Sequence, residues 1–180
     1  QLGLTQEEID DYFTGPAHFP WMRMGNIAHF QGGMSQEWFN AQIALEHKIN
    51  DRELALGMTP VYQGFAGFVP KGILNHYPNV KLTTTEWSSF DKSCLNHMLS
   101  PEDPLFSKIG TSFIKEWEKE FGKGTYYLID SFNEMEIPFG KPGSKEVCDA
   151  MRNYGKNLYD SIKDADPDAV WVMQGWILGY

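Results

Sequence analysis

The stretch Tyr126-Tyr-Leu-Ile-Asp-Ser-Phe-Asn-Glu-Met135 decides how the rest of the chain is interpreted. Its first four residues are apolar, and it turns polar at Asp130. A short apolar run that follows a glycine-rich break and precedes a helix is typical of a buried parallel strand. Polar residues at the carboxyl end of such a strand lie where α/β folds place their chemistry. We therefore predict that Glu134 is a catalytic carboxylic acid; the alternative is a surface glutamate on a solvated loop.

The composition of the 180 residues indicates a single domain with a substantial core. Hydrophobic residues make up 42% and aromatic residues 14%, which argues against disorder. The net charge of -9 argues against nucleic acid or an anionic membrane as a partner, because the long-range field repels both. No run of 18 apolar residues is present, so no membrane span is predicted.

The residues that commonly hold metals and cofactors show no matching motif. Cys94 and Cys148 are far apart and fit no zinc or CxxC pattern, so two free thiols are predicted. The five histidines lack HxxxH spacing, and no glycine fingerprint of a dinucleotide or phosphate loop occurs. We therefore expect no metal and no cofactor.

Strand-like runs alternate with amphipathic helices along most of the chain. The runs cover residues 58–64, 80–85 and 126–129, and a fourth begins at Val170. Helices are expected after the caps at Thr5, Ser35 and Ser144, and after Pro101. The helix after Ser35 is predicted to bury one apolar face, formed by Trp38, Ala41, Leu45, Ile49 and Leu56. The stretch 19–26 has no clear period and is expected to be an ordered loop.

The absence of hairpin turn signals between these runs favours parallel crossovers, as in a (β/α) barrel or a doubly wound sheet. A complete (β/α)8 barrel needs about 250 residues. We therefore predict an α/β fold, a parallel TIM-type barrel present only in part, with later strands missing. Residues 1–57 supply N-terminal helices and a loop, and residues 58–180 supply successive strand–helix units.

Three predicted strand ends carry groups suited to a sugar site: Trp87, then Asn133 with Glu134, then Trp176. If these strands neighbour one another in a barrel, their carboxyl ends converge on one mouth. Tryptophan faces stack on the apolar face of a pyranose, while amide and carboxylate groups hydrogen-bond its hydroxyls. The combination fits a carbohydrate better than a phosphate or an apolar ligand.

Glycoside hydrolysis requires two carboxyl groups, about 5–5.5 Å apart in retaining enzymes and about 6.5–9.5 Å apart in inverting ones. Glu134 fits the group that protonates the leaving oxygen. No partner of equal quality is apparent, and Glu86, Asp130 and Glu136 remain candidates.

An ordered series of motifs runs along nearly the whole chain. The series comprises Phe13-Thr-Gly-Pro-Ala17, Trp21 with Arg23-Met-Gly-Asn26, Gly57-Met-Thr-Pro-Val61, Phe65-Ala-Gly67, Pro101-Glu-Asp-Pro104, Phe132-Asn-Glu-Met135, and Val170-Trp171 with Gln174-Gly-Trp176. In order and spacing, this series closely resembles the central domain of the α-N-acetylglucosaminidases, the family 89 glycoside hydrolases.

This resemblance implies a (β/α)8-type catalytic domain that releases terminal α-linked N-acetylglucosamine with retention, from heparan-sulfate ends or mucin-type glycans. Matched by position, Glu134 corresponds to the general acid/base and Asn133 to a sugar-binding asparagine. Trp21, Trp87 and Trp176 correspond to tryptophans that line the pocket. The nucleophile of the family lies beyond Tyr180, so the remaining barrel segments are required partners and this chain alone is expected to be inactive.

Two other functions remain open: a barrel glycosidase of different linkage specificity, and a non-catalytic sugar-binding barrel. The vertebrate relatives carry two cysteines after the position of Trp87, whereas this chain has only Cys94 there. The chain also lacks Asn-x-Ser/Thr sequons. We therefore expect a bacterial exported enzyme rather than a lysosomal one.

Overall fold

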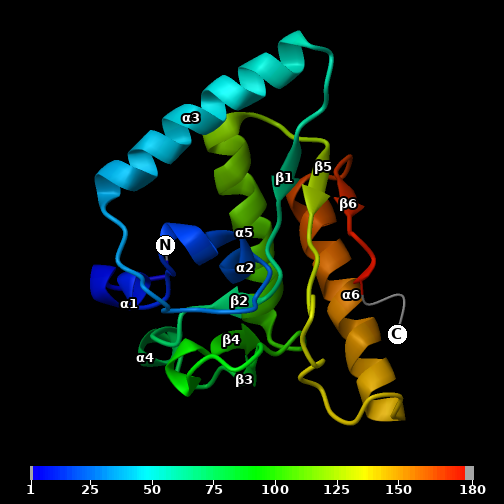
Figure 1. Ribbon diagram of the computed structural model, residues 1–180. Helices are drawn as coiled ribbons and strands as arrows, with labels where there is room; N and C mark the ends of the chain where they lie inside the picture. The colour runs from blue at the N-terminus through cyan, green and yellow to red at the C-terminus, as the bar shows by residue number, and fades with distance from the viewer. Residues whose placement is uncertain (1, 177–180) are drawn as a thin grey trace.

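The computed structural model describes residues 2–176 and contains two small sheets with helices around them (Figure 1). The elements in chain order are α1 (Gln6–Asp10), η1 (Pro16–His18), α2 (Phe19–Arg23), α3 (Gln36–Ala55), β1 (Val61–Gln63), β2 (Phe68–Val69), α4 (Ile73–His76), β3 (Leu82–Thr85), η2 (Lys92–Cys94), β4 (Asn96–Leu99), α5 (Pro104–Phe121), β5 (Tyr126–Leu128), α6 (Lys145–Ala165) and β6 (Val170–Val172).

The first sheet is parallel, in the order β1-β5-β6, and it is the barrel-like part of the fold. Tyr62 and Tyr127 pair in register and pack into the core formed with α5 and α6. The opposite face is bare, since the paired residues Val61, Tyr126 and Val170 are 52%, 37% and 43% exposed. Parallel sheets are normally covered on both faces. The prediction of an α/β fold is confirmed, and among the described residues the parallel strands form an open sheet and not a closed barrel.

The second sheet is antiparallel, in the order β2-β4-β3, and it corrects the prediction of parallel crossovers throughout. The predicted strand at 80–85 exists as β3, but it pairs with β4 along Leu82–Thr85 and Leu99–Asn96. Neither β2 nor β4 was predicted. β2 has only two residues, and local sequence cannot reveal which distant strand completes such a ladder. Trp87 therefore follows a strand of this antiparallel sheet and not a strand of the parallel one.

Helix starts follow the predicted capping residues. Thr5 and Glu8 form a reciprocal capping box at α1, while Ser35 and Ser144 accept hydrogen bonds from the third helical amides of α3 and α6. Asp103 caps α5, with Pro104 in its first turn. The expected loop at 19–26 is wrong in its first part, because α2 occupies Phe19–Arg23.

The long helix α3 does not bury the apolar face predicted for it. Among its residues only Asn50 is buried, and Leu45, Ile49 and the capping Leu56 are exposed. Figure 1 shows α3 crossing near the carboxyl end of α5, away from the second sheet. There His47 of α3 contacts the last residues of α5: its Nε2 lies 2.9 Å from Oε1 of Glu120, and its ring contacts the ring of Phe121. Helical periodicity identifies the residues that share a face, but it does not show that a packing partner is present.

Candidate active site

The site begins where the three parallel strands end. The amide of Gly64 donates to the carbonyl of Leu128 at 2.9 Å, and the amide of Ile129 donates to the carbonyl of Val172 at 3.0 Å. These bonds carry the ladder past β5 and align the carboxyl ends of all three strands at one edge. The polar segment Asp130–Glu134 and, after β6, the exposed Trp176 both leave from this edge.

A strained turn projects Glu134 from the strand end. Phe132 and Glu134 both adopt left-handed backbone conformations, with φ of 61° and 57°. Each such conformation costs a non-glycine residue roughly 1–2 kcal/mol. Phe132 offsets that cost, since its ring is buried and contacts Phe139 and Tyr154 at centroid distances of 5.7 and 5.4 Å. Strain held by packing is characteristic of functional turns, and here it leaves the side chain of Glu134 exposed.

Two hydrogen bonds bring the segments of Trp21 and Trp87 to this turn. The Nδ2 of Asn26 donates to the carbonyl of Asn133 at 2.7 Å, and the hydroxyl of Thr85 donates to the carbonyl of Gly25 at 3.0 Å. Gly25 and Asn26 follow α2, which carries Trp21, whereas Thr85 ends β3, two residues before Trp87. The loop after α2 thus ties the end of the antiparallel sheet to the end of the parallel sheet.

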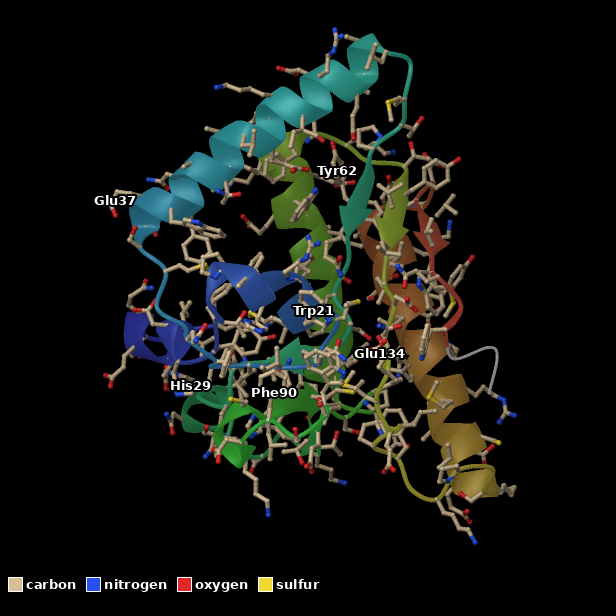
Figure 2. The ribbon with its side chains drawn as sticks, viewed as in Figure 1. Trp21, His29, Glu37, Tyr62, Phe90 and Glu134 are labelled. Carbon is tan, nitrogen blue, oxygen red and sulfur yellow. The ribbon has the colours of Figure 1, made fainter. Side chains whose placement is uncertain are left out.

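The two tryptophans of these segments stack on each other. Their ring centroids are 6.2 Å apart at an interplanar angle of 22°, and Trp87 also stacks on Phe90 at 5.4 Å and 18°. Figure 2 shows Trp21, Phe90 and Glu134 in the same central region of the molecule. Trp87 stacks on two aromatic rings, whereas Trp21, whose ring also contacts His18 at 6.3 Å, remains more exposed.

A cavity of about 540 Å³ separates the end of β3 from the turn of Glu134. This volume lies in the range of small-molecule sites. Its lining includes all three acidic residues Glu86, Glu134 and Glu136, together with Thr84, Thr85, Ser88, Leu95, Met135, Ile137 and Pro138. Glu86 and Glu136, which the sequence leaves open as second carboxylates, therefore share a cavity with Glu134, whereas Trp21 and Trp87 lie outside its lining.

Asp130, the remaining candidate carboxylate, has a different environment. Its side chain is buried, and burial raises the pKa of its carboxyl above 3.8, an effect partly offset by the backbone amide of Gln174. Beside it, Ser131 hydrogen-bonds the hydroxyl of Tyr154, which donates to the carbonyl of Ala66 at 2.9 Å. This buried network joins the ends of β1 and β5 to α6, and burial raises the pKa of Tyr154.

Other parts of the described chain offer no competing centre. Cys94 is buried, Cys148 is exposed, and both are free thiols, as predicted. Within residues 2–176, histidine, cysteine and acidic side chains form no group of three or more that could hold a metal ion. None of the helices described there has the length and apolar character needed to cross a membrane.

Asn26 and Thr85 are the junction residues to which sequence reasoning gave no role. Asn26 belongs to one of the motifs on which the family resemblance rests. Its side chain, however, donates a hydrogen bond to the carbonyl of Asn133, 107 positions away. Nothing local in the sequence specifies that contact.

Comparison with known proteins identifies the family. The family model for the α-N-acetylglucosaminidase TIM-barrel domain matches residues 1–180. The chain belongs to this family. It is 39% identical over 178 residues to human α-N-acetylglucosaminidase. The aligned region covers 98% of this chain but only 23% of the human protein. The resemblance inferred from the motifs is confirmed, and the chain spans less than a quarter of that relative.

Two solved structures agree with this assignment. A family 89 glycoside hydrolase from Clostridium perfringens in complex with 2-acetamido-1,2-dideoxynojirmycin matches with a TM-score of 0.76 at 28% identity, over 97% of this chain and 20% of that one. The same hydrolase with two glutamates replaced by glutamine, in complex with its substrate GlcNAc-α-1,4-galactose, matches with a TM-score of 0.78 at 27% identity, over 97% and 19%. The homologues of this chain are thus hydrolases that act on glycosyl bonds.

Proposed function

We propose that this chain forms the acid/base half of the active site of an exo-acting, retaining α-N-acetylglucosaminidase. The observation that carries the proposal is the strained turn at the carboxyl end of β5, which projects Glu134 into a cavity beside the Trp21 segment. The family match and the substrate-bound relative support a terminal α-linked N-acetylglucosamine as the group released. Heparan-sulfate-type and mucin-type glycans are the proposed sources.

In this mechanism Glu134 donates its proton to the glycosidic oxygen while the bond from that oxygen to the anomeric carbon breaks. A second carboxylate attacks the anomeric carbon from the opposite face and forms a glycosyl–enzyme intermediate. Glu134 then removes a proton from the water that hydrolyses the intermediate. Asn133, Trp21, Trp87 and Trp176 are proposed to hold the terminal sugar.

The second carboxylate is proposed to come from barrel segments outside this chain. The bare face of the parallel sheet supports this, because Val61, Tyr126 and Val170 expose apolar surface where a barrel would place its interior. The chain by itself is therefore expected to bind the terminal sugar and present the proton donor without completing hydrolysis.

The test is the Glu134→Gln variant of the full-length protein, assayed on N-acetylglucosaminides with good and poor leaving groups. For poor leaving groups kcat/KM should fall by about 10²- to 10⁴-fold, the usual contribution of a general acid. The leaving group of an activated dinitrophenyl glycoside needs little protonation, so kcat/KM for that substrate should fall far less. Glu136→Gln is the matched control, since Glu136 lines the same cavity, and it should show no such leaving-group dependence.

Equal losses on both substrates, with folding intact, would count against Glu134 as the acid. The same assay on β-linked substrates tests the linkage. Comparable turnover of α and β anomers would favour a glycosidase of other specificity, and sugar binding without any turnover would favour a non-catalytic barrel.

A further inference from the structure

The turn that carries Glu134 has little internal support. Within the described residues its own backbone contributes one long hydrogen bond, from the amide of Met135 to the carbonyl of Phe132 at 3.4 Å. Phe132 and Glu134 flank the Asn133 carbonyl, and both are left-handed. A non-glycine residue keeps such a conformation only when its surroundings impose it. Phe132 is anchored by its buried ring, so the support of the Glu134 side of the turn must come from elsewhere.

That support is the 2.7 Å hydrogen bond from the Nδ2 of Asn26 to the carbonyl of Asn133. Asn26 is only 2% exposed, so water does not compete readily for the bond. The amide orientation is determined by its surroundings, because the flipped amide would place two oxygens 2.7 Å apart with no donor between them.

Asn26 is itself held rigidly. The backbone amide of Asn26 donates to the carbonyl of Trp21 at 3.0 Å, and the carbonyl of the preceding Gly25 accepts a hydrogen bond from the hydroxyl of Thr85. Gly25 has a φ of 85°, and a Cβ there would lie 2.0 Å from the ring of Phe68. The loop is therefore packed closely enough to act as a fixed support for the turn it contacts.

We infer that Asn26 is a positioning residue that holds the carboxyl of Glu134 in the orientation needed to protonate the leaving group. This inference rests on the acid role proposed for Glu134. The side chain of Asn26 hydrogen-bonds a backbone carbonyl of the turn, and a neutral amide does not transfer a proton, so Asn26 acts through Glu134. Its removal should impair proton donation more than sugar binding.

The experiment replaces Asn26 by Asp in the full-length protein, which preserves the size of the side chain and removes its amide donor. The measured quantity is the ratio of kcat/KM for an activated dinitrophenyl glycoside to that for GlcNAc-α-1,4-galactose. This ratio does not depend on how much of the variant is correctly folded. A misplaced acid should lower kcat/KM on the disaccharide by about 10- to 100-fold and on the activated glycoside by less than about threefold. Asn26→Ala serves as a second variant and should change the ratio in the same direction.

Asn50→Asp is the matched control, because Asn50 is another buried asparagine, located on α3; its ratio should equal that of the parent protein. In a Glu134→Gln background, Asn26→Asp should cost less than about threefold further, since the group it positions is already absent.

The outcomes separate the two proposals. If Glu134→Gln shows the leaving-group dependence and Asn26→Asp lowers kcat/KM equally on both substrates, Asn26 has only a structural role. The inference then fails while the acid role stands. If Glu134→Gln itself shows no dependence, the proposed function fails.

Discussion

Trp21 stacks on Trp87 with ring centroids 6.2 Å apart and an interplanar angle of 22°, although the first belongs to α2 and the second follows β3. Phe90 in turn stacks on Trp87, so three aromatic rings are in contact. The row of rings makes Trp87 a support for Trp21 as well as a candidate sugar contact.

Truncation of Trp87 to Ala should weaken substrate binding partly by releasing Trp21, so the effects of Trp21→Ala and Trp87→Ala on KM should not add. Aromatic pairs of this kind are coupled by about 0.5–1.5 kcal/mol, and a double-mutant cycle on the full-length protein measures that coupling. Strictly additive effects would mean that the two rings contribute independently.

Trp176 provides a second prediction. It is exposed and follows β6, the strand beside β5, which places it at the edge from which Glu134 projects. Trp176→Ala should raise KM on the order of tenfold, equivalent to about 1.4 kcal/mol of binding energy, while thermal unfolding stays near that of the parent protein. A large fall in melting temperature with little change in KM would assign this side chain to the core instead.

Two helical glycines give a paired prediction about stability. A Cβ on Gly110 of α5 would lie 2.7 Å from Oγ and 2.9 Å from Cβ of Ser161 on α6, whereas a Cβ on Gly155 of α6 would approach nothing closer than 3.9 Å. Gly155→Ala should stabilise the fold by about 0.5–1 kcal/mol through backbone entropy. Gly110→Ala should destabilise it, since overpacking costs about 1–3 kcal/mol.

Thermal or denaturant unfolding measures both glycine variants. Adding Ser161→Gly to Gly110→Ala should recover much of the loss by removing the atoms in conflict. If Gly110→Ala were as stabilising as Gly155→Ala, α5 and α6 would not approach each other as closely as described.

The buried Asp130 leads to a prediction about pH. Burial raises the pKa of its carboxyl above the ordinary 3.8, so the native state binds more protons than the unfolded state as the pH passes upward from that value. Stability is therefore lost as pH rises through this window, and the penalty is fully present at neutral pH. Asp130→Asn should raise the melting temperature at pH 7 and leave it nearly unchanged at pH 3.

Asp168→Asn is the control for this comparison, because the Asp168 side chain is 88% exposed in its contact with Lys123. Exposed pairs of this kind contribute little, so the melting temperature of that variant should change little at either pH. A lower melting temperature for Asp130→Asn at neutral pH would show that the carboxylate has a stabilising partner.

Much of the local structure could be predicted from neighbouring residues. Thr5, Ser35 and Ser144 cap helices because a side-chain oxygen satisfies amides two or three positions later. The β5 strand and the polar segment after it were also predicted, since an apolar run of that length followed by charge is a local pattern. The ordered motifs identified the family, which the comparisons confirm.

Tertiary structure alone decided which of these elements meet. The β-prone residues of β3 are compatible with a parallel or an antiparallel partner. Only its pairing with β4 makes the strand part of an antiparallel sheet. The spacing of Leu45 and Ile49 places them on one face of α3, but the packing leaves that face exposed. The link from Asn26 to Asn133 spans 107 positions. Sequence periodicity reports short-range backbone geometry, whereas such contacts arise only when distant segments are packed together and their polar groups must find partners.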